Sequence, residues 1–470
     1  MIPVNVDLRS LAQAGPVHFI GIGGAGMCAL AELVLRSGGR VTGCDLRDSV
    51  RVRELRQLGA GIQLGHDPAH VDEAAAVVVT SAVPVDHPEL LRAHESGVPV
   101  LKRAQALGAW ISQGRVLAVA GTHGKTTTTA MATEILAAAG LEPTGLVGGR
   151  VGSWDGNLRF GSDGIYVVEA DEYDRSFHTL FPDTAVVTNV EADHLDVYGD
   201  LDGVRVGFER FLRGVRQGGR IAACADDYGA SALLASVGSA GYSYGLSAGS
   251  RLRAVDVELG PDGTSCRVYE DGVDVGPLAL SLGGIHNLLN GLGAAAAARS
   301  FEVDWDDIRR GLWGFRGVGR RFELLGEARG VTVVDDYAHH PTEIKATLEA
   351  ARATFPGRRL VAAFQPHLYS RTRDFRDGFG EVLASADVVF VTDVFPAREM
   401  PIPGVTGEMI ADAVRRSGGR DVRYHADLDG LPEALARELK EGDLLLTLGA
   451  GSVERLGSVV LEALEVETHA

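Results

Sequence analysis

Lysine is nearly absent from this chain of 470 residues. The chain has lysine at Lys102, Lys125, Lys345 and Lys440 alone, whereas arginine is common. Acidic residues outnumber basic ones and leave a formal net charge of −18. This charge argues against a general nucleic-acid-binding protein, which needs a basic surface to neutralise phosphates.

Cysteine and long apolar runs are also scarce. Cys28, Cys44, Cys224 and Cys266 are scattered without the spacing of a zinc site, which predicts small buried side chains and no zinc. No segment approaches the roughly 18 uninterrupted apolar residues that span a bilayer. The N-terminus has no basic region followed by an apolar one, so no export signal is evident. We therefore expect a cytoplasmic protein without stable membrane insertion.

Segments typical of strands and helices alternate along the chain, which predicts an α/β fold with parallel sheets. Predicted strands include 17–20, 40–44, 77–80, 165–169, 184–188, 331–334, 360–364, 388–392 and 444–448. Short alternating strands with turns at 251–282 predict a small antiparallel insert. Boundaries at 113–115 and in the glycine-rich segment 314–319 predict domains over 1–113, 114–316 and 317–470.

Lys125 stands in a segment rich in glycine and threonine, residues 120–129. A strand-like run precedes this segment and a helix-like run follows, which is the layout of a phosphate-binding loop. Backbone N–H groups would hold phosphate oxygens, Lys125 would neutralise the β- and γ-phosphates, and Thr126 would bind Mg²⁺. The match is incomplete, because Val119 stands where the general pattern has glycine. A plain glycine–threonine turn before a helix is the alternative.

A second glycine-rich loop, residues 21–26, also lies between a predicted strand and a helix. Asp45 follows at the end of the next strand. This spacing is typical of dinucleotide-binding sites, in which the glycines admit a diphosphate and the acid binds a ribose or base. The pattern alone fits an NAD enzyme, a nucleotide-sugar site or a structural turn.

Two acidic segments follow predicted strands of the central region. Residues 169–172 (Glu-Ala-Asp-Glu) are placed to bind the Mg²⁺ of a nucleotide, with a solvated acidic turn as the alternative. His194 lies among three carboxylates in residues 188–196. A role for His194 at a second metal and a purely structural role are equally compatible with the pattern.

Further polar clusters lie in the last 200 residues. His286, Asn287 and Asn290 begin a helix, where they would either cap it or contact a base. Residues 320–323, 335–343 and 364–373 are dense in arginine and histidine and follow predicted strands. Their clustering at strand C-termini favours a ligand site over surface charge.

In order along the chain, these motifs resemble those of the Mur ligases, ATP-dependent amide-bond-forming enzymes of peptidoglycan synthesis. The similarity rests on residues 21–27, 121–129, 169–172, 191–194, 286–287, 319–322, 335–343, 364–367 and 449–452. It implies three domains: a Rossmann-like UDP-binding domain, a central P-loop ATPase-type α/β domain with a small antiparallel insert, and a C-terminal Rossmann-like domain that receives the amino acid. It also implies roles in cell-wall biogenesis, cell shape and cell division.

The resemblance is strongest to the members that join L-alanine to the lactyl carboxylate of UDP-N-acetylmuramate through an acyl phosphate. It implies the substrates UDP-N-acetylmuramate, L-alanine and ATP, with two Mg²⁺ ions or Mn²⁺ as a substitute. A monomer and a homodimer both remain open.

The resemblance assigns roles to individual residues. Catalysis would fall to Lys125, Glu169, His194 and Arg321, and metal binding to Thr126, Glu169 and His194. ATP would be bound by Gly121, Thr122, His123, Gly124, Lys125, Thr126, Thr127, His286, Asn287, Asn290, Arg321 and Asp336. The UDP-sugar would be bound by Gly23, Gly24, Ala25, Gly26, Asp45, His66, Ser81, His194 and Arg371. The amino-acid pocket would be lined by Tyr337, His339, His367, Arg371 and Arg373.

Two features depart from relatives. Leu368 stands where some relatives have arginine. The contact made by that arginine must therefore be absent here or be supplied by another residue. Sister ligases use a carbamylated lysine between the metals, and this chain has no lysine between Lys125 and Lys345.

Three other functions remain as alternatives. A recycling ligase would add a tripeptide to the same sugar nucleotide. An NAD-dependent dehydrogenase would use residues 21–26 but leave Lys125, Glu169 and His194 unexplained. A non-catalytic nucleotide sensor would bind ATP without turning it over.

Overall fold

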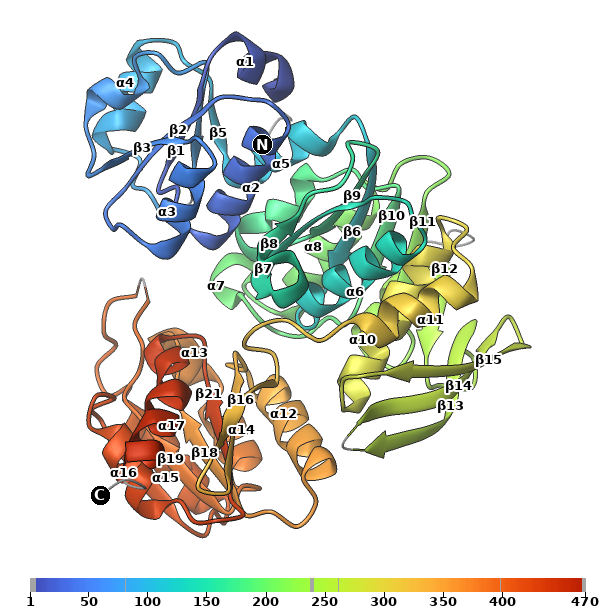
Figure 1. Cartoon of the computed structure of the whole chain (residues 1–470), viewed down its shortest axis with the longest axis vertical. Coiled ribbons are helices and arrows are strands. Elements are labelled where there is room, and N and C mark those ends of the chain that lie inside the picture. Colours follow the sequence, from blue (N-terminus) through green and yellow to red (C-terminus); the bar gives the residue numbers. More distant parts are fainter. Residues whose placement is uncertain (1–5, 81, 237–240, 261, 398, 467–470) are drawn as a thin grey trace. The chain divides into compact units, whose positions relative to one another are not determined.

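The computed structural model describes residues 6–80, 82–236, 241–260, 262–397 and 399–466, and these form three sheets (Figure 1). The residues cluster into two compact units. The first contains residues 1–257, 265–280 and 287–316, and the second contains 258–264, 281–286 and 317–470. No helix among the described residues is long and apolar enough to cross a membrane.

The first sheet is wholly parallel and has the strand order β3-β2-β1-β4-β5. Its N-terminal region consists of α1 (Leu8–Ala14), β1 (Val17–Ile20), α2 (Ala25–Arg36), β2 (Val41–Asp45), α3 (Val50–Gln57), β3 (Gly61–Leu64), the 3₁₀ helix η1 (Pro68–Val71), β4 (Ala76–Val79), α4 (Pro88–Glu95), β5 (Val100–Lys102) and α5 (Arg103–Ile111). The chain reverses direction across the sheet at β1 and β4, which is where open α/β sheets bind ligands. The loop of residues 21–24 follows β1 at this point.

The second sheet has ten strands in the order β15-β14-β13-β12-β11-β10-β6-β9-β7-β8. Its elements are β6 (Arg115–Ala120), α6 (Lys125–Ala138), β7 (Thr144–Val151), η2 (Gly152–Trp154), β8 (Gly156–Arg159), β9 (Ile165–Glu169), η3 (Tyr173–Thr179), β10 (Thr184–Val187), α7 (Leu195–Tyr198), α8 (Leu201–Leu212), β11 (Arg220–Cys224), α9 (Tyr228–Ser236), β12 (Gly241–Gly245), β13 (Leu252–Gly260), β14 (Gly263–Glu270), β15 (Val273–Leu280), α10 (Ile285–Arg299) and α11 (Trp305–Gly314).

In this sheet β6 lies between β9 and β10, and all three strands are parallel. The carboxyl ends of the three strands therefore meet at one edge. The segments predicted to bind phosphate and metal follow these strands, so the fold brings them together from separate parts of the chain.

The third sheet has the order β16-β17-β21-β18-β19-β20, with β16 antiparallel to β17 and the other pairs parallel. Its elements are β16 (Glu323–Ala328), β17 (Val331–Asp336), α12 (Pro341–Thr354), β18 (Leu360–Phe364), α13 (Tyr369–Asp374), α14 (Arg376–Leu383), β19 (Val388–Val391), α15 (Gly407–Arg416), β20 (Val422–Tyr424), α16 (Leu431–Glu438), β21 (Leu444–Leu448), η5 (Ser452–Arg455) and α17 (Leu456–Val466).

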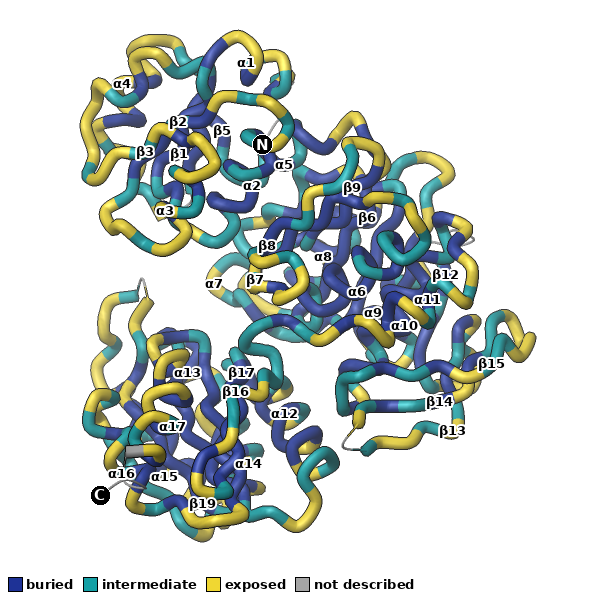
Figure 2. Tube along the Cα trace, viewed as in Figure 1, coloured by how far each residue is buried: buried dark blue, intermediate teal, exposed yellow. Residues whose placement is uncertain are grey.

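Figure 2 shows that buried residues concentrate in the strands at the centre of each sheet. Strands β1, β4 and β10 are buried along their whole length, as expected of parallel strands covered on both faces. This burial explains why these strands could be predicted as continuous apolar runs. The short strands β3 and β5 were not predicted, because β3 is largely exposed and β5 has three residues.

The α/β class and the predicted insert are confirmed. Strands β14 and β15 form a hairpin through the turn at Asp271 and Gly272, and with β13 they extend the second sheet at one end. The cysteines Cys28, Cys44, Cys224 and Cys266 are all free and buried, as predicted.

Candidate active site

The predicted phosphate-binding loop joins β6 to α6, and its path requires glycine at two positions. Gly124 has a φ of 80°, and a Cβ added there would lie 2.4 Å from Oδ1 of Asn290. Gly121 has a φ of 145°, and its Cβ would lie 1.9 Å from Oγ1 of Thr188. A side chain is therefore excluded at both positions, because the backbone has a positive φ and because no space is left for a Cβ. The loop leads directly into the N-terminus of α6, where unpaired backbone N–H groups favour an anion.

The segment after β10 braces this loop through hydrogen bonds. The Asn189 carboxamide accepts from the His123 N–H at 2.8 Å and donates to the His123 carbonyl at 3.1 Å. The Thr188 hydroxyl donates to the same carbonyl at 2.6 Å, and the Glu191 N–H donates to the Thr122 hydroxyl at 2.9 Å. Sequence reasoning assigned Thr188 and Asn189 no role, because their partners lie about 65 residues away.

Lys125 lies at the first position of α6, and its ammonium meets a buried carboxylate. Its Nζ is 2.8 Å from Oε2 of Glu172 and donates to the Gly121 and Thr122 carbonyls at 2.5 and 3.1 Å. Burial by itself lowers the pKa of Lys125, but the charges of Glu172, Asp171 and Glu169 outweigh it and leave the pKa raised. Burial also raises the pKa of Glu172 to about 7, despite the opposing charge of Lys125.

Glu169, the last residue of β9, lies beside the loop with Thr126. Its carboxylate accepts the Gly148 N–H at 2.6 Å and is hydrogen bonded to the Thr126 hydroxyl. Burial raises the pKa of Glu169, while these two hydrogen bonds and Lys125 act in the opposite direction. A carboxylate and a hydroxyl held together are hard oxygen donors of the kind that Mg²⁺ prefers. The fold thus brings together two of the predicted metal ligands.

His194 follows β10 with a φ of 52°, which turns the chain before α7. Its Nε2 lies 3.9 Å from Oε1 of Glu172, and its ring lies 5.1 Å from that of Tyr173. The Tyr198 hydroxyl donates to the Glu172 carbonyl at 2.7 Å. Glu172 therefore lies between Lys125 and His194. The sequence motif alone did not show which of Glu169 and Glu172 takes this position.

The loop after β1 is hydrogen bonded to Asp45, the acidic residue predicted to bind a ribose or base. The Gly23 N–H donates to Oδ2 of Asp45 at 2.9 Å, and the Arg47 N–H donates to the other oxygen at 3.1 Å. A Cβ on Gly23 would lie 2.9 Å from the same Oδ2 atom. The end of β2 is thus held against the glycine loop, which places Asp45 beside Gly23 as the spacing indicated.

A cavity of about 210 Å³ connects this loop region with the Glu169 carboxylate. Its lining includes Gly26, Arg103, Gly148, Glu169 and Asp171. The Arg103 guanidinium is 3.9 Å from Oδ2 of Asp171, and a Cβ on Gly26 would lie 3.0 Å from the Arg103 side chain. Arg103 was not among the predicted site residues, because an arginine at a helix start is common on protein surfaces.

His66 and Ser81 were also predicted to bind the UDP-sugar, and the structure describes only the first of them. Nδ1 of His66 lies 3.2 Å from Sγ of Cys44 and 3.4 Å from Oε2 of Glu89, just past β3. Ser81 lies outside the described residues.

In the second unit, Arg321, Asp336 and Tyr337 come together at the carboxyl end of β17. The Arg321 guanidinium lies 5.0 Å from the centre of the Tyr337 ring and 3.6 Å from the Glu343 carboxylate. The buried Asp336 carboxylate accepts the N–H groups of Phe322 and Ala338 at 2.8 and 2.7 Å. Burial raises the pKa of Asp336 to about 6, although the Arg321 charge opposes the shift.

Most of the predicted amino-acid pocket also gathers at this edge. The His339 ring lies 5.2 Å from Tyr337 and 5.9 Å from His367, and His367 Nδ1 is 3.3 Å from the buried Arg371 guanidinium. Arg373 instead lies exposed, and its guanidinium binds the adjacent Asp374 at 2.7 Å. At Leu368 the backbone has a φ of 69°, an unusual conformation for a branched side chain.

The residues around the start of α10 divide between the units. Asn290 is buried against the phosphate loop, where its Oδ1 accepts from the Thr128 hydroxyl at 3.2 Å, and Asn287 is buried one turn earlier. His286 belongs to the second unit.

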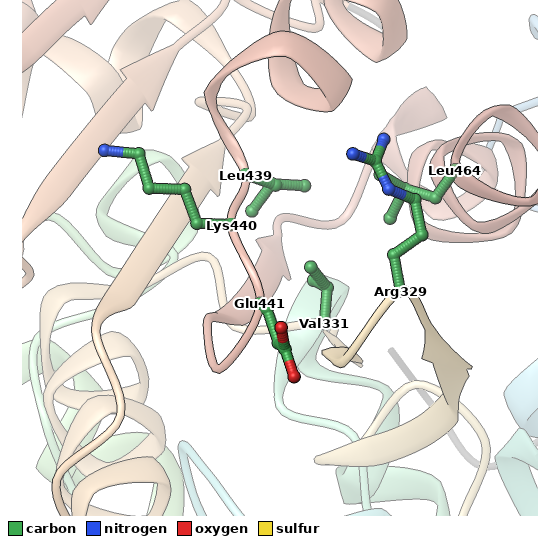
Figure 3. A pocket seen from close by; sticks show the side chains of 6 residues that line it. All are labelled: Arg329, Val331, Leu439, Lys440, Glu441 and Leu464. Carbon is green, nitrogen blue, oxygen red and sulfur yellow. The ribbon is translucent and has the colours of Figure 1, made fainter. Parts of the chain in front are cut away.

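Another cavity, of about 400 Å³, lies in the second unit and holds none of the predicted residues (Figure 3). Its lining is Arg329, Val331, Leu439, Lys440, Glu441 and Leu464. Val331 begins β17, so the cavity lies at the amino ends of the strands. Ligands of open α/β sheets bind at the carboxyl ends, and we therefore assign this cavity no role.

Comparison with known proteins identifies the fold. Three family models match successive parts of the chain: the Mur ligase family catalytic domain at residues 16–115, the Mur ligase middle domain at 119–298, and the Mur ligase glutamate ligase domain at 320–451. A UDP-N-acetylmuramate–L-alanine ligase of Geobacter sp. (strain M21) is 46% identical over 445 residues, covering 95% of this chain and 96% of the relative.

Two solved structures share the fold. The UDP-N-acetylmuramate–alanine ligase of Thermotoga maritima superposes with a TM-score of 0.82 at 30% identity and covers 96% of this chain and all of its own. A murein peptide ligase of Psychrobacter arcticus has a TM-score of 0.71 at 27% identity, covering 96% of this chain and 99% of its own. These matches confirm the three-domain α/β architecture and the predicted resemblance. The chain belongs to the Mur ligase family.

Proposed function

We propose that this protein joins L-alanine to the lactyl carboxylate of UDP-N-acetylmuramate at the expense of ATP. The observation that carries the proposal is the cavity that runs from Gly26, in the nucleotide-sugar loop, to Glu169, beside Lys125 and Thr126. A substrate whose diphosphate binds the loop of residues 21–26 would direct its other end toward the phosphate-binding loop at residues 121–126. Relatives at 46% identity carry the name of this ligase.

The reaction proceeds in two substitutions. A carboxylate oxygen of the lactyl group attacks the γ-phosphorus of ATP, and ADP leaves with the electrons of the broken bond. The amine of L-alanine then attacks the acyl carbon, phosphate leaves, and the amine loses a proton as the amide forms. Both steps need alignment and charge neutralisation rather than a side-chain nucleophile.

The residues of the first unit suit these needs. Lys125 and the N-terminus of α6 would hold the terminal phosphates, and the N–H groups of residues 23–26 would hold the sugar-nucleotide diphosphate. Asn287 and Asn290, with His286, would contact the adenine, while Asp45, His66 and Ser81 would contact the uridine. From the second unit, Arg321 and Asp336 would contact ATP, and Tyr337, His339, His367, Arg371 and Arg373 would receive the amino acid.

Mg²⁺ fits Thr126 and Glu169, whose oxygens are already held together, and His194 would contribute to a second ion; Mn²⁺, which takes the same oxygen ligands, would substitute for Mg²⁺. Such ions supply charge neutralisation for the transferred phosphoryl group. Since the substrates are nucleotides and an amino acid, we place the reaction in the cytoplasm.

Phosphate release from ATP, measured with Mg²⁺ and UDP-N-acetylmuramate, tests the proposal. Release that requires both the sugar nucleotide and L-alanine is expected. Release with the tripeptide L-alanyl-γ-D-glutamyl-meso-diaminopimelate but not with L-alanine would instead assign a recycling ligase. Silence with both acceptors would contradict a ligase function.

A further inference from the structure

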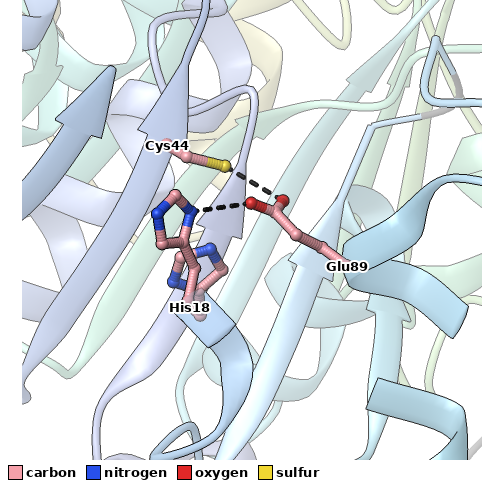
Figure 4. A group of neighbouring side chains, drawn as sticks. His18, Cys44 and Glu89 are labelled. Carbon is pink, nitrogen blue, oxygen red and sulfur yellow. Dashed lines mark hydrogen bonds and ion pairs between the residues drawn. The ribbon is translucent and has the colours of Figure 1, made fainter. Parts of the chain in front are cut away.

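A buried carboxylate in the N-terminal region is surrounded by imidazole and thiol groups. Glu89, in the first turn of α4, is fully buried, and its Oε1 lies 2.8 Å from Nδ1 of His70. The Cys44 thiol, at the end of β2, donates to Oε2 at 3.1 Å. Figure 4 shows Cys44 and Glu89 facing each other above His18. None of these groups takes part in the proposed reaction.

His18 adds an unpaired nitrogen to this group. Its side chain lies on β1 and is 1% exposed. Nδ1 is 3.0 Å from the Thr42 hydroxyl, which holds the ring in place, while Nε2 has no hydrogen-bond partner among the described residues. A buried nitrogen without a partner costs free energy, so its retention next to three potential ligands requires an explanation.

We propose that His18, Cys44, His70 and Glu89 form a site for a tetrahedral transition-metal ion, with Zn²⁺ as the expected occupant. One donor atom from each residue lies within 4.8 Å of the others. Zinc bonds of about 2.0–2.3 Å place the ligands of a tetrahedral site roughly 3.3–3.8 Å apart, so a small contraction suffices. Two imidazoles, one thiolate and one carboxylate are all established zinc donors.

Charge balance supports a dication here. Without an ion, the fully buried Glu89 carboxylate is compensated by hydrogen bonds from the Asp67 N–H, the Cys44 thiol and His70. A divalent ion with the Cys44 thiolate and the Glu89 carboxylate leaves no net charge in the buried site. Burial and the Glu89 charge raise the pKa of Cys44, so the ion must displace the thiol proton.

The spacing of the cysteines along the chain predicts no zinc site. The four residues come from β1, β2, η1 and α4 and are spread over 72 positions, so no linear motif exists. The site also lies next to the loop of residues 21–26, because Cys44 precedes Asp45, whose carboxylate accepts the Gly23 N–H. The Cys44 sulfur is also 3.2 Å from Nδ1 of His66. The inference does not depend on the proposed ligase reaction.

Cobalt(II) titration of chelator-treated protein tests the site directly. We expect one Co²⁺ per chain, intense visible bands typical of tetrahedral coordination, a thiolate-to-cobalt band in the near ultraviolet, and loss of both on adding Zn²⁺. Cys44→Ser should abolish the thiolate band, whereas Cys266→Ser, at a buried cysteine on β14, should leave the spectrum unchanged.

His18→Gln provides a second variant that keeps the thiol and carboxylate. It should weaken Zn²⁺ affinity by roughly 10-fold or more, with circular dichroism confirming that the fold is retained. Weak octahedral cobalt spectra, or affinity unchanged by both Cys44→Ser and His18→Gln, would overturn the proposal and indicate an adventitious ion only.

Discussion

The Lys125 ammonium lies 2.8 Å from the Glu172 carboxylate, and both side chains are largely buried. This ion pair links the head of α6 to the segment after β9. A phosphate that binds the loop must share or replace the carboxylate as the partner of Lys125. Glu172 balances the charge of the lysine, and we expect it to compete with any phosphate that binds the loop.

Replacing Lys125 with alanine should reduce ligase turnover by several orders of magnitude, because the charge on the transferred phosphoryl group would lose its cation. Binding of UDP-N-acetylmuramate, measured by calorimetry, should persist, since the substitution leaves the loop of residues 21–26 unchanged. Lys440→Ala, which removes an exposed lysine of the second unit, is the control and should retain normal turnover. Near-normal turnover of Lys125→Ala would contradict the assignment of the phosphate loop.

Glu172→Gln should lower the melting temperature of the nucleotide-free protein, because it leaves the Lys125 charge buried without its anion. ATP should then stabilise the variant more than the natural protein, since phosphate would supply the missing partner. Differential scanning fluorimetry with and without ATP measures both effects. Glu73→Gln, at an exposed carboxylate, should change neither. An equal ATP shift in all three proteins would show that Glu172 does not compete with phosphate.

Gly124→Ala should impair both stability and ATP turnover, because the new Cβ would meet Asn290 at 2.4 Å and the residue has a φ of 80°. Gly140 offers a matched control at the end of the same helix, with a φ of 74° and no atom within 4 Å of its Cβ. Gly140→Ala should cost only the backbone strain, about 1 kcal/mol. Comparing melting temperatures and turnover of the two variants separates strain from the collision. Equal losses in both would rule out a role for the Asn290 contact.

Arg103→Ala should raise the KM for UDP-N-acetylmuramate by roughly 10- to 100-fold, because a charge-assisted contact in the cavity between Gly26 and Glu169 would be lost. The KM for ATP should change little. Arg92→Ala, at an exposed arginine of α4, is the control for the loss of positive charge. A KM for the sugar nucleotide that is the same in all three proteins would place Arg103 outside the substrate site.

The second unit should lose stability as pH rises from about 4 to 7, owing to Asp336. Burial raises its pKa from an ordinary 3.8 to about 6, so the folded state holds the proton more tightly than the unfolded state. The stabilisation is complete below pH 3.8 and disappears as pH passes 6. At most it amounts to about 3 kcal/mol.

Asp336→Asn cannot ionise, so its stability relative to the natural protein should improve between pH 4 and 7. Any constant cost of the amide beside two N–H donors would not depend on pH. Amide hydrogen exchange in β17 and β21, corrected for its intrinsic pH dependence, measures this difference. A pH-independent difference between the two proteins would show that folding does not raise the pKa of Asp336.

Much of the fold was predictable because buried parallel strands are continuous apolar runs. The strands at 17–20, 331–334, 360–364 and 444–448 were located from this signal and are confirmed. Strands β3 and β5 were missed because they are short or exposed at the sheet edge. The domain limits 1–113, 114–316 and 317–470 and the roles of individual site residues remain predictions.

The sequence by itself determined which residues follow the carboxyl ends of strands and, through the order of its motifs, the family. It could not decide which carboxylate of residues 169–172 meets Lys125 and which meets Thr126. Nor did it reveal the support of the phosphate loop by Thr188 and Asn189, the place of Arg103, or the grouping of His18, Cys44, His70 and Glu89. These relationships depend on β6 lying between β9 and β10, and β1 between β2 and β4. Parallel crossovers make such strands neighbours at long sequence separation, so only the tertiary structure brings their side chains together.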